Sequence, residues 1–146
     1  MSTTETVRSA AAVLKALDAE VSGGDLRKIG DYLADDFKFI GVADHPLSKA
    51  ETIGLWTAIR AALPDFNHNL SSVREAYNIV YATVEVTGTH TGTLNAPGGI
   101  SLPPTGRTLH NPAERVAVTV RNGRVTEWVV EHVPGGGFAG VLGQLA

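Results

Sequence analysis

The clearest pattern of hydrophobic and polar positions lies between Ile79 and Thr91, where the two classes alternate residue by residue. One set of alternate positions is apolar or small and ends at a histidine: Val80, Ala82, Val84, Val86, Gly88 and His90. Because successive side chains of a β-strand point to opposite faces, this pattern predicts a strand with one buried face. His90 then points toward whatever that face covers, either as a tethered core histidine or as part of a pocket.

Apolar residues at three- and four-residue steps predict three helices in the first half of the chain. The first spans about 4–21 and starts at a capping box formed by Ser2 and Glu5. The second is a short helix that Asp25 caps. The third begins at a second capping box, Ser48-Lys49-Ala50-Glu51.

Short apolar or alternating runs bounded by Gly, Pro, Asn and Asp predict strands elsewhere. These strands are 37–42, 66–74, 79–91, 108–121 and 124–133, and a last short helix follows at 138–145. Asn122-Gly123 predicts a type I′ hairpin between the last two strands. Helices followed by antiparallel strands are typical of the α+β class, and we see no repeat or linker. We therefore expect a single domain over residues 1–146.

Composition narrows the classes of protein that the chain can belong to. Hydrophobic residues make up 43% and charged residues 18% of the 146 positions, as in ordinary globular proteins. The net charge is −3 with scattered Lys and Arg, which argues against nucleic-acid and membrane-surface binding. No signal peptide is visible, and no apolar run approaches the roughly 20 residues of a membrane span. We expect a soluble cytoplasmic protein.

Five short strings of residues resemble one known family. They are Ala61-Ala62-Leu63-Pro64-Asp65-Phe66, Thr87-Gly88-Thr89-His90-Thr91-Gly92, Pro103-Pro104-Thr105-Gly106-Arg107, Asn122-Gly123-Arg124-Val125 and Gly143-Gln144-Leu145. Together they resemble the SnoaL-like polyketide cyclase branch of the nuclear-transport-factor-2-like superfamily over nearly the whole chain. The resemblance implies a cone, in which a curved antiparallel or mixed sheet wraps around N-terminal helices. It also implies a homodimer, because proteins of this fold commonly dimerise.

The resemblance carries an expectation about catalytic residues as well. SnoaL-like cyclases use an aspartate on the last strand, helped by a histidine on the strand before it. The last predicted strand here has no aspartate, so Glu131 or Glu127 is the candidate for that role, and His110 is the candidate histidine. The fold also hosts isomerases, dehydratases, epoxide hydrolases and binding proteins.

The alternation of the last two strands selects further acid/base candidates. Glu114 shares the apolar face of its strand, where it either faces a pocket or forms an ion pair with Arg107, Arg115 or Arg124. On the final strand, three valines favour the face that carries Glu131 as the inward one. The opposite register places Trp128 and His132 in the pocket instead.

A pocket wall in this fold is mostly apolar and aromatic. The candidates for that wall are Trp56, Tyr32, Phe37, Phe39, Trp128, His132 and His68. His68 shares a face with Phe66 and Leu70, so it is either structural or directed into the pocket. The chain has no cysteine, no His spacing or HExxH motif typical of metal sites, no GxSxG nucleophile elbow and no dinucleotide fingerprint. We expect neither a metal nor a cofactor.

These observations predict an enzyme that uses acid/base chemistry on a hydrophobic small molecule, such as intramolecular aldol ring closure, isomerisation or hydration. Glu131 and Glu114 are the candidates for proton transfer, and His90 and His110 for orienting them or binding an enolate oxygen. Two alternatives remain: a non-catalytic protein that binds a hydrophobic ligand, and a dimeric scaffold. The predicted dimer surface is the outer sheet face, which carries Thr83, Glu85, Thr87 and Thr119.

Overall fold

The computed structural model of the protein describes residues 9–96 and 98–146. The helices in these residues are α1 (Ala10–Val21), the 3-10 helix η2 (Leu26–Tyr32), α2 (Lys49–Ala62) and α3 (Gly137–Leu145). The strands are β1 (Leu33–Ile40), β2 (Leu47–Ser48), β3 (Ser71–Ala76), β4 (Ile79–Val84), β5 (Thr87–Thr89), β6 (Leu94–Ala96), β7 (Ile100–Leu102), β8 (Thr108–His110), β9 (Glu114–Arg121) and β10 (Arg124–Glu131). The order of elements confirms the predicted α+β class.

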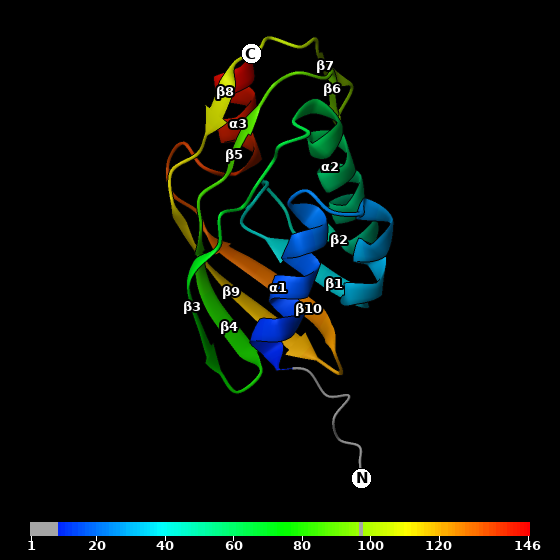
Figure 1. Cartoon of the computed structure of the whole chain (residues 1–146), viewed down its shortest axis with the longest axis vertical. Coiled ribbons are helices and arrows are strands. Elements are labelled where there is room, and N and C mark those ends of the chain that lie inside the picture. Colours follow the sequence, from blue (N-terminus) through cyan, green and yellow to red (C-terminus); the bar gives the residue numbers. More distant parts are fainter. Residues whose placement is uncertain (1–8, 97) are drawn as a thin grey trace.

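Within the described residues, six strands form the main sheet in the order β2-β1-β10-β9-β4-β3. Its neighbouring strands are antiparallel except for β1 and β10, which run parallel. Helix α1 lies across one face of this sheet, and α3 lies beside the small sheet of β5 and β8 at the other end of the molecule (Figure 1). No helix in the described ranges is both long and apolar enough to cross a membrane.

Helix starts follow the capping residues of the sequence. Ser48 accepts from the backbone N–H of Glu51, and the Glu51 side chain accepts from the N–H of Ser48, so the predicted capping box of α2 is confirmed. Asp25 caps η2 as predicted. Ser9 is the N-cap of α1, whereas the capping box predicted farther upstream, at residues 2 and 5, lies outside the described residues.

Two long predicted strands are each divided in two. The strand predicted at 79–91 is interrupted between β4 and β5, and the one predicted at 108–121 is interrupted between β8 and β9. The longer pieces, β4 and β9, stay in the main sheet, whereas the shorter pieces, β5 and β8, leave it and pair with each other. The alternation nevertheless continues across the first break, since Val80, Gly88 and His90 are all buried.

Two other predicted boundaries are wrong. The strand predicted at 37–42 instead spans Leu33–Ile40, so Asp35 and Asp36 lie within β1, where both are exposed and the pairing with β10 shifts register. In the strand predicted at 66–74, only the last residues belong to β3. The preceding segment bends at Asn69, whose φ is 50°, and makes an isolated bridge between Asn67 and Thr87.

A β-bulge in β10 decides which side chains enter the core. The pairing with β9 shifts between Val125 and Glu127, so the two-residue period is broken at that point. Beyond the bulge, Trp128 and Val130 are buried and Glu131 is exposed. The prediction that Glu131 faces inward is therefore wrong, and the alternative register is the observed one.

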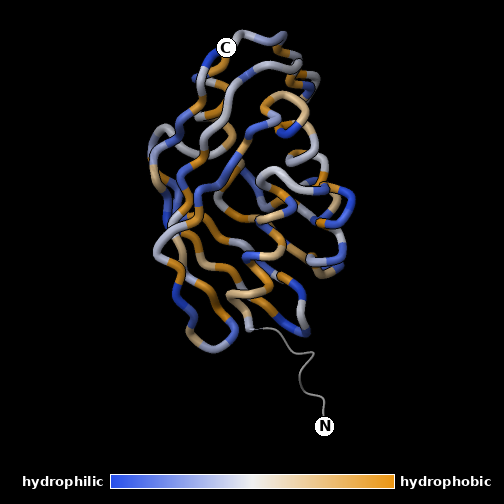
Figure 2. The backbone as a smooth tube through the Cα atoms, viewed as in Figure 1, coloured by the Kyte–Doolittle hydropathy of each residue, from blue (hydrophilic) through white to orange (hydrophobic). Residues whose placement is uncertain are grey.

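The core fills the space between the helices and the inner face of the main sheet. Figure 2 shows hydrophobic stretches along its strands and hydrophilic stretches at the loops that join them. Phe39, Trp56 and Trp128 form an aromatic cluster with ring centroids 5.6 to 5.8 Å apart. This cluster forms one wall of the cavity described next.

Candidate functional site

A cavity lies between α2, α3 and the inner face of the main sheet. Its lining is mostly apolar: Phe39, Val42, Leu55, Trp56, Ile59, Phe66, His68, Val84, Val86, Asn111, Glu114, Trp128, Val130, Gly137, Phe138 and Val141. The volume is about 50 Å³, enough for one or two water molecules. A larger ligand therefore needs side chains or α3 to move.

A buried histidine–aspartate pair borders this cavity. His68 Nδ1 lies 2.5 Å from Oδ1 of Asp18, and their side chains are only 6% and 12% exposed. Asp18 comes from the last turn of α1, whereas His68 follows the turn after α2. A carboxylate at Nδ1 favours the tautomer that is protonated there, which leaves Nε2 as the nitrogen available to a ligand. This is the arrangement of a positioned general base.

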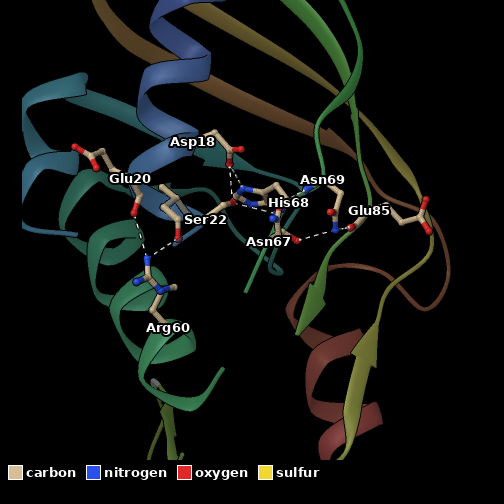
Figure 3. A network of polar contacts seen from close by, with 9 residues as sticks. Asp18, Glu20, Ser22, Arg60, Asn67, His68, Asn69 and Glu85 are labelled. Carbon is tan, nitrogen blue, oxygen red and sulfur yellow. Dashed lines mark hydrogen bonds and ion pairs between the residues drawn. The ribbon is translucent and has the colours of Figure 1, made fainter. Parts of the chain in front are cut away.

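Contacts from two elements hold the pair in place (Figure 3). The Ser22 hydroxyl donates to Oδ1 of Asp18 and accepts from the backbone N–H of His68, both at 3.1 Å. Arg60 of α2 donates to the backbone carbonyls of Glu20 and Val21 at 3.2 and 2.9 Å, and so caps the end of α1. The pair therefore belongs to a network that joins both helices to the segment that carries the histidine.

Asp65 anchors the segment between α2 and His68. Its carboxylate accepts from the backbone N–H of Thr89 at 2.7 Å and from the Thr89 hydroxyl at 2.8 Å. The backbone hydrogen bond is the main reason that the pKa of the Asp65 carboxyl is lowered from its ordinary value. This contact fixes the end of α2 against β5.

Glu114 occupies another part of the cavity wall. It is buried at the start of β9, and its Oε2 accepts from the backbone N–H of Val133 at 3.0 Å. His132 Nδ1 lies 3.5 Å from the same oxygen, so the ion-pair partner among the described residues is a histidine rather than an arginine. A Cβ at Gly136 would lie 2.4 Å from Glu114 Oε2, so glycine permits this close approach. The predicted inward face of Glu114 is confirmed.

The other predicted catalytic residues do not line the cavity. Glu131 is exposed on the opposite face of β10 because of the bulge. His110 is 61% exposed and pairs with Glu85. His90 is fully buried, and its Nδ1 lies 2.9 Å from the Thr105 hydroxyl, so the structure favours the tethered core histidine.

The predicted wall residues divide in a similar way. Trp56, Phe39, Trp128 and His68 line the cavity. His132 lies 54% exposed beside Glu114. Phe37 is buried but does not line the cavity, nor does Tyr32, which ends η2. Within residues 9–96 and 98–146, no three His, Asp or Glu side chains are grouped to hold a metal ion.

Sequence reasoning missed Asp18, although a signal for it exists. The buried positions of α1 are Ala10, Val13, Leu14, Leu17, Asp18 and Val21. A carboxylate within this apolar stripe, four residues after one buried position and three before another, needs a buried partner. The chain alone does not say that the partner is His68.

A comparison with models of protein families identifies the family of the chain. The family model described as SnoaL-like polyketide cyclase matches residues 11–132. The chain belongs to this family. The implied cone fold is thereby supported, and the last strand of this SnoaL-like protein carries Trp128 and Val130, not an aspartate, on its inner face.

Solved structures resemble this SnoaL-like protein in fold. A proposed SnoaL-like polyketide cyclase from Jannaschia sp. CCS1 is 16% identical, with a TM-score of 0.70 over 93% of this chain and 90% of that one. IdmH, a proposed polyketide cyclase from Streptomyces antibioticus, is 22% identical, with a TM-score of 0.66 over 84% and 91%. AclR, a proposed hydroxylase from Streptomyces galilaeus, is 21% identical, with a TM-score of 0.67 over 86% and 76%. No curated protein matches the chain.

Proposed function

We propose that this SnoaL-like protein is a cofactor-independent enzyme of the cyclase type that removes a proton next to a carbonyl group of a hydrophobic substrate. The observation that carries the proposal is the buried His68–Asp18 pair at the wall of an apolar cavity. His68 Nε2 accepts the proton, and Asp18 stabilises the imidazolium that forms. The resulting enolate attacks a second carbonyl of the same molecule, which closes a ring.

Glu114 is the second proton-transfer group in this proposal. Its carboxyl group lines the same cavity as His68 and is paired with His132, which is half exposed. Such a pair can exchange protons with solvent at one end and with a bound molecule at the other. Glu114 therefore protonates the oxygen of the aldol product, while His68 carries out the first step.

Substrate entry requires the cavity to enlarge. Its volume of about 50 Å³ is well below the several hundred Å³ typical of ligand pockets. Helix α3 supplies Phe138 and Val141 to the wall, and it begins at Gly137, two residues after Gly135; the φ angles of Gly135 and Gly137 are 87° and 67°. Outward movement of α3 about this glycine-rich segment is the opening that the proposal requires.

Hydrogen–deuterium exchange tests the proton-abstraction step without knowledge of the natural substrate. The bicyclic ketone 2-tetralone is incubated with the protein in D₂O, and loss of its α-proton signals is followed by NMR. We expect the wild type to accelerate exchange and H68Q to lose that acceleration, with H110Q as the matched control. Equal rates in all three proteins would contradict the proposal, and binding without exchange would favour a non-catalytic binding protein.

The protein also forms a homodimer in this proposal, through the outer face of the main sheet. A groove on that face is lined by Arg74, Tyr81, Thr83, Arg115, Ala117, Val129 and Glu131, among others. Arg115 and Glu131 lie opposite each other on β9 and β10, and neither forms an ion pair within the described residues. A two-fold axis through this face brings Arg115 of one copy to Glu131 of the other.

Light scattering tests the dimer. We expect Arg115→Glu to give a monomer and the double variant Arg115→Glu/Glu131→Arg to restore the dimer, because the swap re-establishes opposite charges. A monomeric wild type, or a double variant that is as monomeric as the single variant, would contradict the proposed dimer interface.

A further inference from the structure

Buried polar atoms without a hydrogen-bond partner are uncommon in proteins, so each of them needs a physical explanation. In the described part of the chain, four buried side-chain atoms have no hydrogen-bond partner: Thr52 Oγ1, Arg60 Nε, His90 Nε2 and Trp128 Nε1. Of these four residues, only Trp128 lines the cavity. The indole N–H of Trp128 is thus the unpaired donor associated with the candidate site.

The surroundings of Trp128 offer this donor nothing to bind. The side chain is 1% exposed, and its neighbours are the rings of Phe39, Trp56 and His68, with centroids 5.7, 5.8 and 5.3 Å away. A buried donor that has lost its water and gained no partner is destabilising. A phenylalanine at this position would fill the aromatic core without burying an unpaired donor. The presence of an indole N–H therefore indicates a role other than packing.

An indole nitrogen donates and does not accept, so its ligand must present an acceptor. The cavity wall is otherwise mostly apolar, which selects a hydrophobic molecule with a carbonyl oxygen rather than a charged one. His68 and Trp128 are adjacent in this wall, so one small molecule can contact both. Its oxygen then lies at Trp128 while the carbon next to the carbonyl lies at His68.

We propose that Trp128 is the binding residue for the carbonyl oxygen of an apolar ketone, and that its indole N–H stabilises the enolate oxygen that His68 creates. The role in the reaction rests on the proposed function, whereas the role in binding does not. Proton transfer from carbon to His68 leaves the electron pair on the oxygen, where a preorganised donor stabilises the developing charge. The donor comes from β10, the strand on which the family resemblance implied a carboxylate.

Two matched ligands and two matched variants test the binding role. The ligands are 2-tetralone and tetralin, which share a bicyclic skeleton and differ in the carbonyl group. The variants are W128F, which removes the proposed donor, and W56F, which removes the indole of the neighbouring cavity residue. A single hydrogen bond contributes a modest amount, so W128F should weaken 2-tetralone binding about two- to tenfold while tetralin binding changes less than twofold. W56F should change both affinities equally.

NMR of the unmodified protein provides a readout that does not depend on the folding of a variant. The chain has two tryptophans and therefore two indole N–H signals. Saturation with 2-tetralone should move the Trp128 indole proton downfield, as hydrogen bonding does, and tetralin should not. An unmoved Trp128 signal, equal losses for both ligands in W128F, or no binding of 2-tetralone would overturn the inference. Loss of exchange in H68Q with intact ketone binding separates this test from that of the proposed function.

Discussion

Two of the protein's histidine–carboxylate pairs share the same chemistry but lie in different surroundings. His68 and Asp18 are 6% and 12% exposed and border an apolar cavity, whereas His110 and Glu85 are 61% and 46% exposed. Water and salt screen the outer pair, so it adds little to stability and has no enclosed space in which to act. Burial and an adjacent cavity, rather than the residue types, therefore distinguish a candidate catalytic pair from a surface ion pair.

The two pairs also differ in what holds them. Ser22 contacts both members of the inner pair, and Arg60 fixes the helix end that carries Asp18. On the outer side, the His110 backbone N–H donates to Gln144 of α3, but the ring itself has Glu85 as its partner. The inner ring is therefore held in one orientation, as a general base requires.

The largest expected difference between the two pairs is the effect of substituting each histidine on the rate of α-proton exchange. Because a positioned acid/base group contributes about 10²–10⁴ in rate, H68Q should reduce α-proton exchange of 2-tetralone by that factor. H110Q should leave the rate within about twofold, since its ring does not line the cavity. The exchange rates of both variants are measured by NMR at equal protein concentration. A larger loss of rate in H110Q than in H68Q would contradict the assignment of His68 as the general base.

The two candidate glutamates extend the comparison to carboxylates. Glu114 lines the cavity and Glu131 lies on the outer face, so E114Q should slow ring closure by about 10²-fold while E131Q leaves that rate unchanged. Neither variant should change the α-proton exchange of 2-tetralone, which needs only His68. NMR of the cyclisation of an apolar diketone measures ring closure, and circular dichroism verifies folding. If E131Q is the slower variant, the bulge in β10 does not decide which carboxylate acts.

Removing the hydroxyl that joins the inner pair gives a smaller effect. Ser22→Ala removes two hydrogen bonds inside the network, so the free energy of unfolding should fall by about 1–3 kcal/mol in urea titrations. The exposed Ser101→Ala is the control and should change stability by less than about 0.5 kcal/mol. A positioning role also predicts that Ser22→Ala shifts the pH profile of exchange, which a purely structural role would leave in place.

The smallest expected effect concerns an exposed carboxylate bound to backbone. The Thr89 N–H lowers the pKa of Asp65 in the folded protein, so this carboxylate stabilises the fold above its unfolded pKa of about 3.9. That stabilisation is lost as the pH falls through the lower folded pKa. Asp65→Asn should therefore reduce stability slightly at pH 7 and flatten its decline below pH ~4, as measured by thermal unfolding across pH. If stability declines below pH ~4 in Asp65→Asn as it does in the wild type, Asp65 does not contribute to this pH dependence.

Local features of the fold were predictable from the chain. Ser48 and Glu51 form a capping box as their spacing indicates, and Asn122 and Gly123 adopt the positive φ angles of 53° and 76° that a tight hairpin needs. Glu114 shares its buried face with the neighbouring valines, as the alternation indicates. Each of these features depends on residues a few positions apart, and such short-range rules can be read directly.

The site depends on contacts that no local rule contains. Asp18 and His68 lie 50 positions apart in the sequence. They come together only because α1 packs against the main sheet, on strands β3, β4 and β9. The β10 bulge inserts one residue into a regular alternation and exchanges Glu131 for Trp128 and Val130 on the inner face. Most elements, the family resemblance and most buried faces can therefore be predicted from the amino-acid sequence. The polar groups that meet in the cavity follow only from the folded structure, because a one-residue shift reverses a strand's faces and a buried charge is tolerated only where its partner is brought to it.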